Sequence, residues 1–160
     1  MEVLSFTDEK GRSVRREIVR HPGAVVVVPV LEDGRLVLIR NYRIAVDDRL
    51  WELPAGKLEE NEEPQRAAAR ELEEETGYRA GRIRPLTAFF TSPGFADERI
   101  HAFIAEELTF VGQNLEPGEQ IEAETLPRDE VLAMIADGRI RDGKTIAAVL
   151  MWDHFSGTPR

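Results

Sequence analysis

The sequence contains no cysteine and no long apolar run. Its 160 residues therefore cannot form a disulfide, a thiolate metal site or a cysteine nucleophile. No segment has the roughly 20 consecutive apolar residues that a membrane-spanning helix needs. The opening MEVLSFTDEK also lacks the basic and apolar regions of a secretory signal. These absences lead us to expect a cytoplasmic protein with no membrane partner.

Basic residues are scarce relative to acidic ones. The chain has 21 Lys and Arg against 30 Asp and Glu, which gives a formal net charge of −9 at pH 7. Binding to a nucleic-acid backbone normally requires a basic face, so we expect no nucleic-acid partner. A small anionic substrate is still compatible with this charge, because acidic side chains can bind metal ions that in turn hold a phosphate.

Hydrophobic patterning predicts one domain of the α+β class, residues 23–160, preceded by a β-hairpin segment, residues 1–22. The run AVVVVPV predicts a strand buried on both faces, with RLVLIRNYRI as its hairpin partner after Glu32-Asp33-Gly34. The remaining predicted segments are a helix at 64–76, strands at 82–90, 99–108 and 120–126, and helices at 127–137 and 144–155. This order indicates an α/β/α sandwich around a mixed sheet.

The predicted helix at 64–76 carries a cluster of carboxylates. Glu71, Glu74 and Glu75 stand at i, i+3 and i+4, so they share one helix face. A run such as RELEEE is usually a solvated helix face. However, like charges at these spacings destabilise a helix by a few tenths of a kcal/mol per pair, and a cation would neutralise them. Mg²⁺ prefers a few carboxylate oxygens and leaves its other positions to water and phosphate.

The spacing of this segment resembles the Nudix box, in which glycines, glutamates and an arginine stand at fixed separations. The matching positions are Gly56, Glu62, Arg70, Glu71, Glu74, Glu75 and Gly77. The position after the last glycine, normally aliphatic, is Tyr78. The resemblance implies the Nudix α/β/α sandwich with a mixed central sheet and an N-terminal antiparallel segment.

The resemblance also implies roles for these residues. Glu71 and Glu75 are expected as the principal metal ligands, with Glu74 and the backbone carbonyl of Ala55 as additional ones. The expected ion is Mg²⁺, with Mn²⁺ as an alternative and Zn²⁺ ranked below both. The bound metals would activate water for attack on a phosphorus of a nucleoside diphosphate derivative.

Four further box residues are expected to support the loop that precedes the helix. An ion pair between Glu62 and Arg70 would orient the loop against the helix. Gly56 and Gly77 stand at the two ends of the box and would also give structural support to this loop.

Outside the box the chain resembles the ADP-ribose pyrophosphatases over nearly its whole length. The stretches that carry this likeness are HPGAVVVVPV with LIRNYRIA, WELPAGKLEENE, and FFTSPGFADERIHAF, in which Pro93 lies sixteen residues beyond Gly77. The resemblance implies hydrolysis of ADP-ribose to AMP and ribose 5-phosphate. It assigns substrate contacts to Arg43, Glu52 and Glu98, although a strand-end arginine or glutamate is otherwise most often a solvated charge.

The resemblance to the ADP-ribose pyrophosphatases implies that a glutamate on a late loop takes the proton from the attacking water or helps to hold a further metal. Two residues of the loop Gly112 to Gln120 are candidates, Glu116 and Glu119, and Pro117-Gly118 separates them with a turn. We rank Glu119 first because it precedes Ile121 by two positions. Solvated loop charges are the alternative interpretation. If neither residue acts, the base lies in the Nudix helix, where Glu75 and Glu74 share the catalytic face.

The predicted hairpin at 1–22 has too little apolar area to be stable alone, and the resemblance places it across a homodimer interface.

The sequence leaves three alternatives to ADP-ribose hydrolysis. The enzyme could act on another nucleotide sugar, a dinucleotide or an oxidised nucleoside triphosphate. The chain could be a non-catalytic nucleotide-sensing module, although such modules usually lose glutamates of the box, or an acidic helical domain without a ligand.

Overall fold

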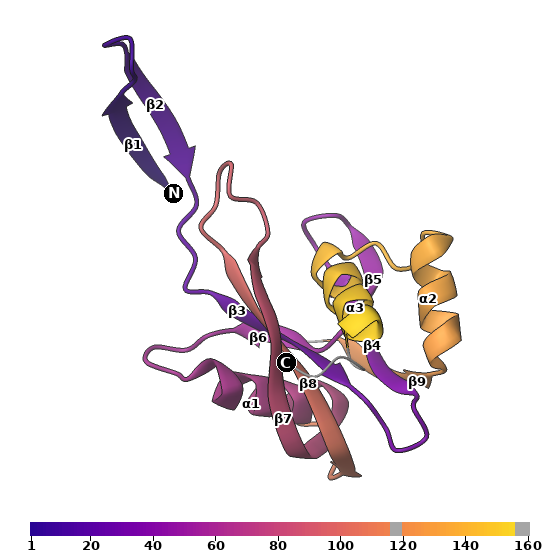
Figure 1. Ribbon diagram of the computed structural model, residues 1–160. Helices are drawn as coiled ribbons and strands as arrows, with labels where there is room; N and C mark the ends of the chain where they lie inside the picture. Colours follow the sequence, from indigo (N-terminus) through magenta and orange to yellow (C-terminus); the bar gives the residue numbers. More distant parts are fainter. Residues whose placement is uncertain (116–119, 156–160) are drawn as a thin grey trace.

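The computed structural model describes residues 1–115 and 120–155 of the chain (Figure 1). The elements in this part are β1 (Glu2–Thr7), β2 (Ser13–Ile18), β3 (Ala24–Pro29), β4 (Leu36–Arg43), β5 (Asp48–Glu52), β6 (Ala55–Lys57), α1 (Pro64–Thr76), β7 (Tyr78–Phe90), β8 (Arg99–Phe110), β9 (Ile121–Leu126), α2 (Arg128–Ala136) and α3 (Gly143–Phe155). Within the described ranges, every helix is too short or too polar to cross a membrane.

A mixed sheet forms the centre of the molecule. Its strand order is β6-β3-β8-β7, in which β3 runs parallel to β8 and antiparallel to β6, and β7 and β8 are antiparallel. Every residue of β3 is buried, because the strand has a neighbour on each side and a helix over each face. The prediction of a strand buried on both faces is confirmed.

The two faces of this sheet belong to two apolar clusters. On one face, Val25 and Val27 pack against Ala67, Ala68 and Leu72 of α1. The opposite face packs against Ala148, Val149 and Trp152 of α3. Figure 1 shows α1 and α3 on opposite sides of the sheet. Burying a side chain such as that of Leu72 contributes about 1.5–3 kcal/mol, so this packing fixes α1 firmly on the sheet. The predicted α+β sandwich is confirmed.

The predicted hairpin between β3 and the following strand is wrong. β4 pairs with β5 and β9 in a separate antiparallel sheet of order β5-β4-β9, and only an isolated bridge joins Val30 to Leu36. The physical reason is that β6 and β8 already satisfy both edges of β3. Chain proximity favoured a hairpin, but a strand with two partners has no hydrogen-bonding edge left.

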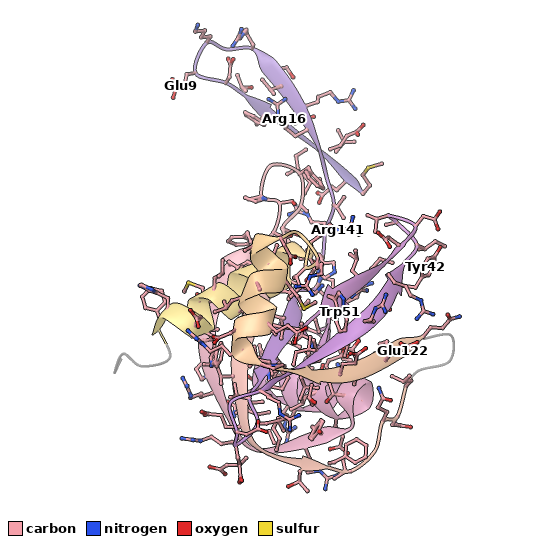
Figure 2. The ribbon with its side chains drawn as sticks, turned by 90° about the vertical axis from the view of Figure 1, so that its right-hand side faces the viewer. Glu9, Arg16, Tyr42, Trp51, Glu122 and Arg141 are labelled. Atoms are coloured by element: carbon pink, nitrogen blue, oxygen red, sulfur yellow. The ribbon has the colours of Figure 1, made fainter. Side chains whose placement is uncertain are left out.

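The N-terminal hairpin extends away from the rest of the molecule. β1 and β2 pair antiparallel from Glu2↔Ile18 to Thr7↔Ser13, and Figures 1 and 2 show the hairpin, with Glu9 and Arg16, standing clear of the sandwich. The backbone beyond it returns to the body at Val19, whose N–H donates to the carbonyl of Phe95 over 2.8 Å.

Candidate functional site

Two clefts meet at one wall of the molecule. The smaller one, of about 360 Å³, is lined by Arg70 and by three glutamates of α1, Glu71, Glu74 and Glu75; we call it the acidic cleft. The larger one, of about 690 Å³, extends to the start of α3 and to residues 91–98, here called the SPGF loop; we call it the large cleft. The residues that line both are Arg43, Ala55, Gly56 and Lys57.

Helix α1 brings its carboxylates to the acidic cleft because its opposite face is fixed in the core. The helix begins at Pro64, where the fixed backbone angle of proline suits the first turn. It ends before Gly77, whose φ of 75° is left-handed. The acidic cleft is lined by Glu71, Glu74 and Glu75. The prediction that these three glutamates share one helix face is confirmed.

Glu75 is the most buried of the three glutamates, at 3% exposed. Its Oε2 accepts a hydrogen bond of 2.8 Å from the backbone N–H of Ala55 in β6. This contact joins β6, an edge strand of the mixed sheet, to the last turn of α1. It also places the backbone of Ala55 beside the carboxylate, where the sequence predicts a shared metal site.

Gly56 provides the space in which the carboxylate of Glu71 lies. A Cβ atom at position 56 would stand 1.8 Å from Oε1 of Glu71, well inside van der Waals contact. The lack of a side chain at this position therefore allows the carboxylate to approach the strand. This is a close approach that only glycine permits.

Arg70 neutralises much of the negative charge of this region. Its Nε and Nη2 each donate to Glu62 over 3.0 Å, so the predicted ion pair is present. Nη1 donates to Glu71 over 2.7 Å and to Glu74 over 3.1 Å. The hydrogen bond to Glu62 is the main reason that the pKa of Arg70 is raised, and the same contact lowers the pKa of Glu62.

The donor set fits a hard divalent cation in the chemical type of its atoms. It consists of carboxylate oxygens on one helix face, beside a backbone strand and a space that only glycine leaves open. In the part of the chain that the structure describes, no three acidic or histidine side chains are arranged as a complete ligand set. Glu71 and Glu74 turn toward Arg70 instead, so metal binding requires these two carboxylates to rotate away from the guanidinium.

The SPGF loop forms the far side of the large cleft. Glu98 lines this cleft, and its Oε2 accepts a hydrogen bond of 2.7 Å from the hydroxyl of Thr91. Asp97 accepts from the backbone N–H of His21 over 2.8 Å and from Arg20 over 2.9 Å. These contacts hold the loop against the backbone that leads from the N-terminal hairpin.

Arg43 stands at the junction of the two clefts, and Glu52 lies beneath it. Glu52 is fully buried, lines neither cleft, and accepts two hydrogen bonds of 2.7 Å from Arg43 and one of 2.6 Å from Lys144. Burial alone would raise the pKa of Glu52, but these two cations outweigh it and hold the pKa below its ordinary value. Direct contact of Glu52 with a substrate stays a prediction.

Glu116 and Glu119 are outside the described residues. Two aromatic side chains near strand ends, Tyr42 and Phe95, are exposed and line neither cleft. Figure 2 shows Tyr42 at the rim of the β4–β5 hairpin.

Sequence reasoning missed residues of the large cleft that come from distant parts of the chain, namely Phe89, Phe90, Asp142 and Lys144. One signal was available for Lys144. It lies in the first turn of α3, where the helix dipole disfavours a cation.

Sequence comparison identifies relatives that cover most of the chain. The chain is 43% identical over 141 residues to an ADP-ribose pyrophosphatase of Bacillus subtilis, covering 87% of this chain and 76% of the relative. It is 44% identical over 141 residues to a methanol dehydrogenase activator of Bacillus methanolicus, with the same coverage.

Structural comparison points to the same fold. A crystal structure of an ADP compounds hydrolase superposes with a TM-score of 0.82 at 21% sequence identity, covering 98% of this chain and 87% of the other. The sequence profile of the NUDIX domain matches residues 19–149, which include every described residue of the two clefts. With this match and with relatives above 40% identity, the chain belongs to the Nudix family.

Proposed function

We propose that this Nudix protein hydrolyses the diphosphate of ADP-ribose to AMP and ribose 5-phosphate, with Mg²⁺ as its cofactor. The observation that carries the proposal is the wall shared by the two clefts. It places Arg43 between the carboxylates of α1 and a larger cavity. A diphosphate at this wall would have one end near the predicted metal ligands. The large cleft would hold the sugar or nucleoside on its other side.

Several residues at the acidic cleft have a proposed task. Glu71 and Glu75 would hold the metal, with Glu74 and the carbonyl of Ala55 assisting. When bound, the metal supplies positive charge for the phosphoryl oxygens and lowers the pKa of a bound water. Arg70 and Glu62 would keep the loop and helix in register. Arg43 would bind a phosphate oxygen, since guanidinium groups match phosphate geometry.

The proton of the attacking water needs an acceptor, and Glu119 is our proposed base. The proposal rests on its place in the family pattern, because residue 119 lies outside the described part of the chain. A general base contributes on the order of 10²–10⁴-fold to the rate. Glu119→Gln should therefore lower kcat by about that factor and leave KM nearly unchanged, while Glu116→Gln should do little. If Glu116→Gln lowers kcat and Glu119→Gln does not, Glu116 is the base and Glu119 is not.

Two further expectations belong to this proposal. The hairpin β1–β2 exposes Val3, Leu4 and Phe6 at 48%, 36% and 52%, so we propose that it packs on a second copy in a homodimer. At the SPGF loop, Glu98 would contact the sugar. The cytoplasmic location stays a prediction.

A substrate panel tests the proposed activity. ADP-ribose, a nucleotide sugar and a dinucleotide are incubated with wild type, with and without Mg²⁺, Mn²⁺ or Zn²⁺, and the products are separated by chromatography. We expect AMP and ribose 5-phosphate from ADP-ribose, and no turnover after chelation. The Bacillus methanolicus relative has a different name at a similar identity, so the panel includes diphosphates other than ADP-ribose. Preference for another diphosphate, or full activity without a metal, would refute the proposal.

One variant pair ties the activity to the helix. Glu75→Gln keeps an oxygen that can accept the N–H of Ala55 but removes the negative charge, so it should fold normally and lose turnover at ordinary Mg²⁺. Glu130→Gln, an exposed change on α2, is the control and should behave like wild type.

A further inference from the structure

Lys144 occupies a position that the reaction proposed above does not yet use. It lies in the first turn of α3 and lines the large cleft, where its side chain is only 16% exposed. Its Nζ contacts Oε2 of Glu52 over 2.6 Å and Oδ1 of Asp142 over 2.9 Å. The same Oε2 of Glu52 accepts from Nη2 of Arg43 over 2.7 Å. The ammonium and the guanidinium therefore stand side by side on one carboxylate oxygen.

The backbone around Lys144 is fixed by independent contacts. The hydroxyl of Thr145 accepts from the backbone N–H of Leu53 over 2.8 Å and donates to Asp142 over 2.6 Å. Arg141 forms an ion pair with Asp48 at the start of β5. Figure 2 shows Arg141 on the side of the molecule that carries Trp51. Because Arg141 and Thr145 are held by Asp48 and Leu53, on either side of position 144, Lys144 has little freedom to leave the cleft.

A purely structural role explains this arrangement poorly. A buried ion pair is often no more stabilising than an apolar pair of similar volume, because both charges lose hydration. Here two cations share one fully buried carboxylate, and both also line the large cleft. Among the residues that the structure describes, nothing accepts from Nη1 of Arg43. Lys144 has three N–H donors and two carboxylate partners. Each side chain therefore keeps a donor that a ligand in the large cleft could accept from.

We propose that Lys144 is a second phosphate-binding residue of this enzyme, which acts beside Arg43 on the diphosphate of the substrate. The proposal rests on the proposed function, since it assumes a nucleoside diphosphate derivative in the two clefts. Arg43 lines both clefts, whereas Lys144 lines only the large one. Lys144 therefore contacts the phosphate farther from the carboxylates of α1. Glu52 and Asp142 hold its ammonium in place for this contact.

Steady-state kinetics test the proposal with matched variants. Lys144→Met removes the charge and keeps the length of the side chain. We expect KM to rise about 10-fold or more while kcat changes about threefold or less, because a charged hydrogen bond made equally in ground state and transition state is lost. The Mg²⁺ concentration for half-maximal activity should not change. Lys144→Arg should recover part of the affinity. Arg139→Met removes an exposed cation that pairs with Asp137, and its KM should match that of wild type.

Folding of each variant is checked by thermal unfolding before kinetics. A folded Lys144→Met with KM within twofold of wild type overturns the proposal, as does a variant that loses kcat alone. The diphosphate used is whichever one the wild type cleaves in the substrate panel. Failure of ADP-ribose as a substrate would thus refute the proposed function without deciding the role of Lys144.

A measurement on the wild type covers the case in which Lys144→Met does not fold. The chain has only three lysines, at positions 10, 57 and 144. Reductive methylation of each is followed by mass spectrometry with and without a non-hydrolysable analogue of the diphosphate that the wild type cleaves, in which a methylene group replaces the bridging oxygen. The analogue should slow modification of Lys144 at least about threefold and leave Lys10, on the exposed hairpin, unchanged. Unchanged modification of Lys144 at saturating analogue would overturn the proposal.

Discussion

At the scale of single residues, three glutamates of α1 at the acidic cleft, Glu71, Glu74 and Glu75, share one helix face but have different surroundings. Glu75 is buried and accepts the N–H of Ala55. Glu71 fills the space above Gly56, and Glu74 is more exposed and pairs with Arg70. Burial and backbone contacts constrain Glu75, so it can supply a fixed ligand. The other two carboxylates must leave the guanidinium to complete a metal site.

Gly56→Ala tests the space above this glycine. A Cβ at position 56 would overlap the carboxylate of Glu71, but a flexible carboxylate can move aside. We therefore expect a folded protein in which Glu71 is displaced, with Mg²⁺ affinity lowered about 10-fold or more. Metal binding is measured by isothermal titration calorimetry and folding by circular dichroism. Gly94→Ala, where a Cβ meets nothing within 4 Å, is the control. Unchanged Mg²⁺ affinity in Gly56→Ala would show that Glu71 does not need the space above this glycine to bind the metal.

Glu52→Gln tests the buried carboxylate as a source of stability. The change leaves Arg43 and Lys144 without their shared anion. Losing one partner of a buried pair costs about 3–5 kcal/mol, but the side chain of Arg43 is 41% exposed and can be hydrated. We therefore expect a loss of about 2 kcal/mol in the free energy of unfolding at pH 7, measured with urea. Glu122→Gln, at an exposed pair with Arg49, should change it by less than about 1 kcal/mol.

The difference in the free energy of unfolding between wild type and Glu52→Gln should depend on pH, with a definite sign. The pKa of Glu52 in the folded protein lies below its ordinary value of 4.5. Its contribution is therefore complete above the unfolded pKa and is lost as pH falls through the folded one. The difference in the free energy of unfolding between wild type and Glu52→Gln should therefore become smaller as the pH is lowered from 7 toward the acidic limit of folding. A gap that widens in acid would contradict the assignment.

At the scale of elements, α1 is defined by its two ends and by one apolar face. Pro64 begins it, Gly77 ends it, and Ala67, Ala68 and Leu72 bury its inner face against β3. The glycine does more than end the helix. Its carbonyl accepts from the backbone N–H groups of Val111 and Gly112 beyond β8. The C-terminus of the acidic helix is thereby fixed to the segment that follows β8.

A comparison of Gly77→Ala with Gly138→Ala separates the cost of a left-handed φ at a helix end from the cost of crowding by the added Cβ atom. Both glycines have left-handed φ angles, 75° and 80°. A Cβ at position 77 would lie 2.8 Å from backbone atoms of Gly112 and Gln113, whereas one at 138 meets nothing within 4 Å. We expect Gly138→Ala to lower the free energy of unfolding by about 1 kcal/mol and Gly77→Ala by about 3 kcal/mol in urea denaturation. Equal losses would mean that the crowding at position 77 relaxes without cost.

At the scale of the whole molecule, the sandwich and the N-terminal hairpin differ in how they are stabilised. The sandwich buries two apolar clusters, one on each face of the mixed sheet. Every residue of β1 is exposed, and a two-stranded hairpin is at best marginally stable alone. The hairpin therefore needs a protein surface on which to pack. We propose that a second copy of the chain provides this surface.

Removal of residues 1–18 tests this assembly. The deletion leaves Val19, Arg20 and His21, which hydrogen-bond to the SPGF loop, so it isolates the effect of the hairpin. We expect a dimer for the full chain and a monomer for the truncated one by light scattering, with a higher KM for the substrate. Val3→Ser combined with Phe6→Ser keeps the hairpin and removes its apolar surface, and should also give a monomer. A full-length monomer, or a truncated dimer with unchanged KM, would reject the interface.

The amino-acid sequence determined the features that depend on local geometry. The ends of α1, the common face of Glu71, Glu74 and Glu75, and the buried strand β3 all follow from helix periodicity, proline, glycine and a β-branched run. Spacing along one helix fixes which side chains are neighbours, whatever the rest of the fold. The box spacing therefore sufficed to predict the Nudix family, which the comparisons confirm.

Only the tertiary structure decided the partners that are distant in the sequence. β4 joined β5 and β9 because β6 and β8 had taken both edges of β3. Lys144 reached Glu52 across 92 residues because α3 packs on the mixed sheet. Such contacts depend on which edges and faces are still free once the core has assembled. No local pattern in the sequence encodes that outcome, because it is a property of the packed whole.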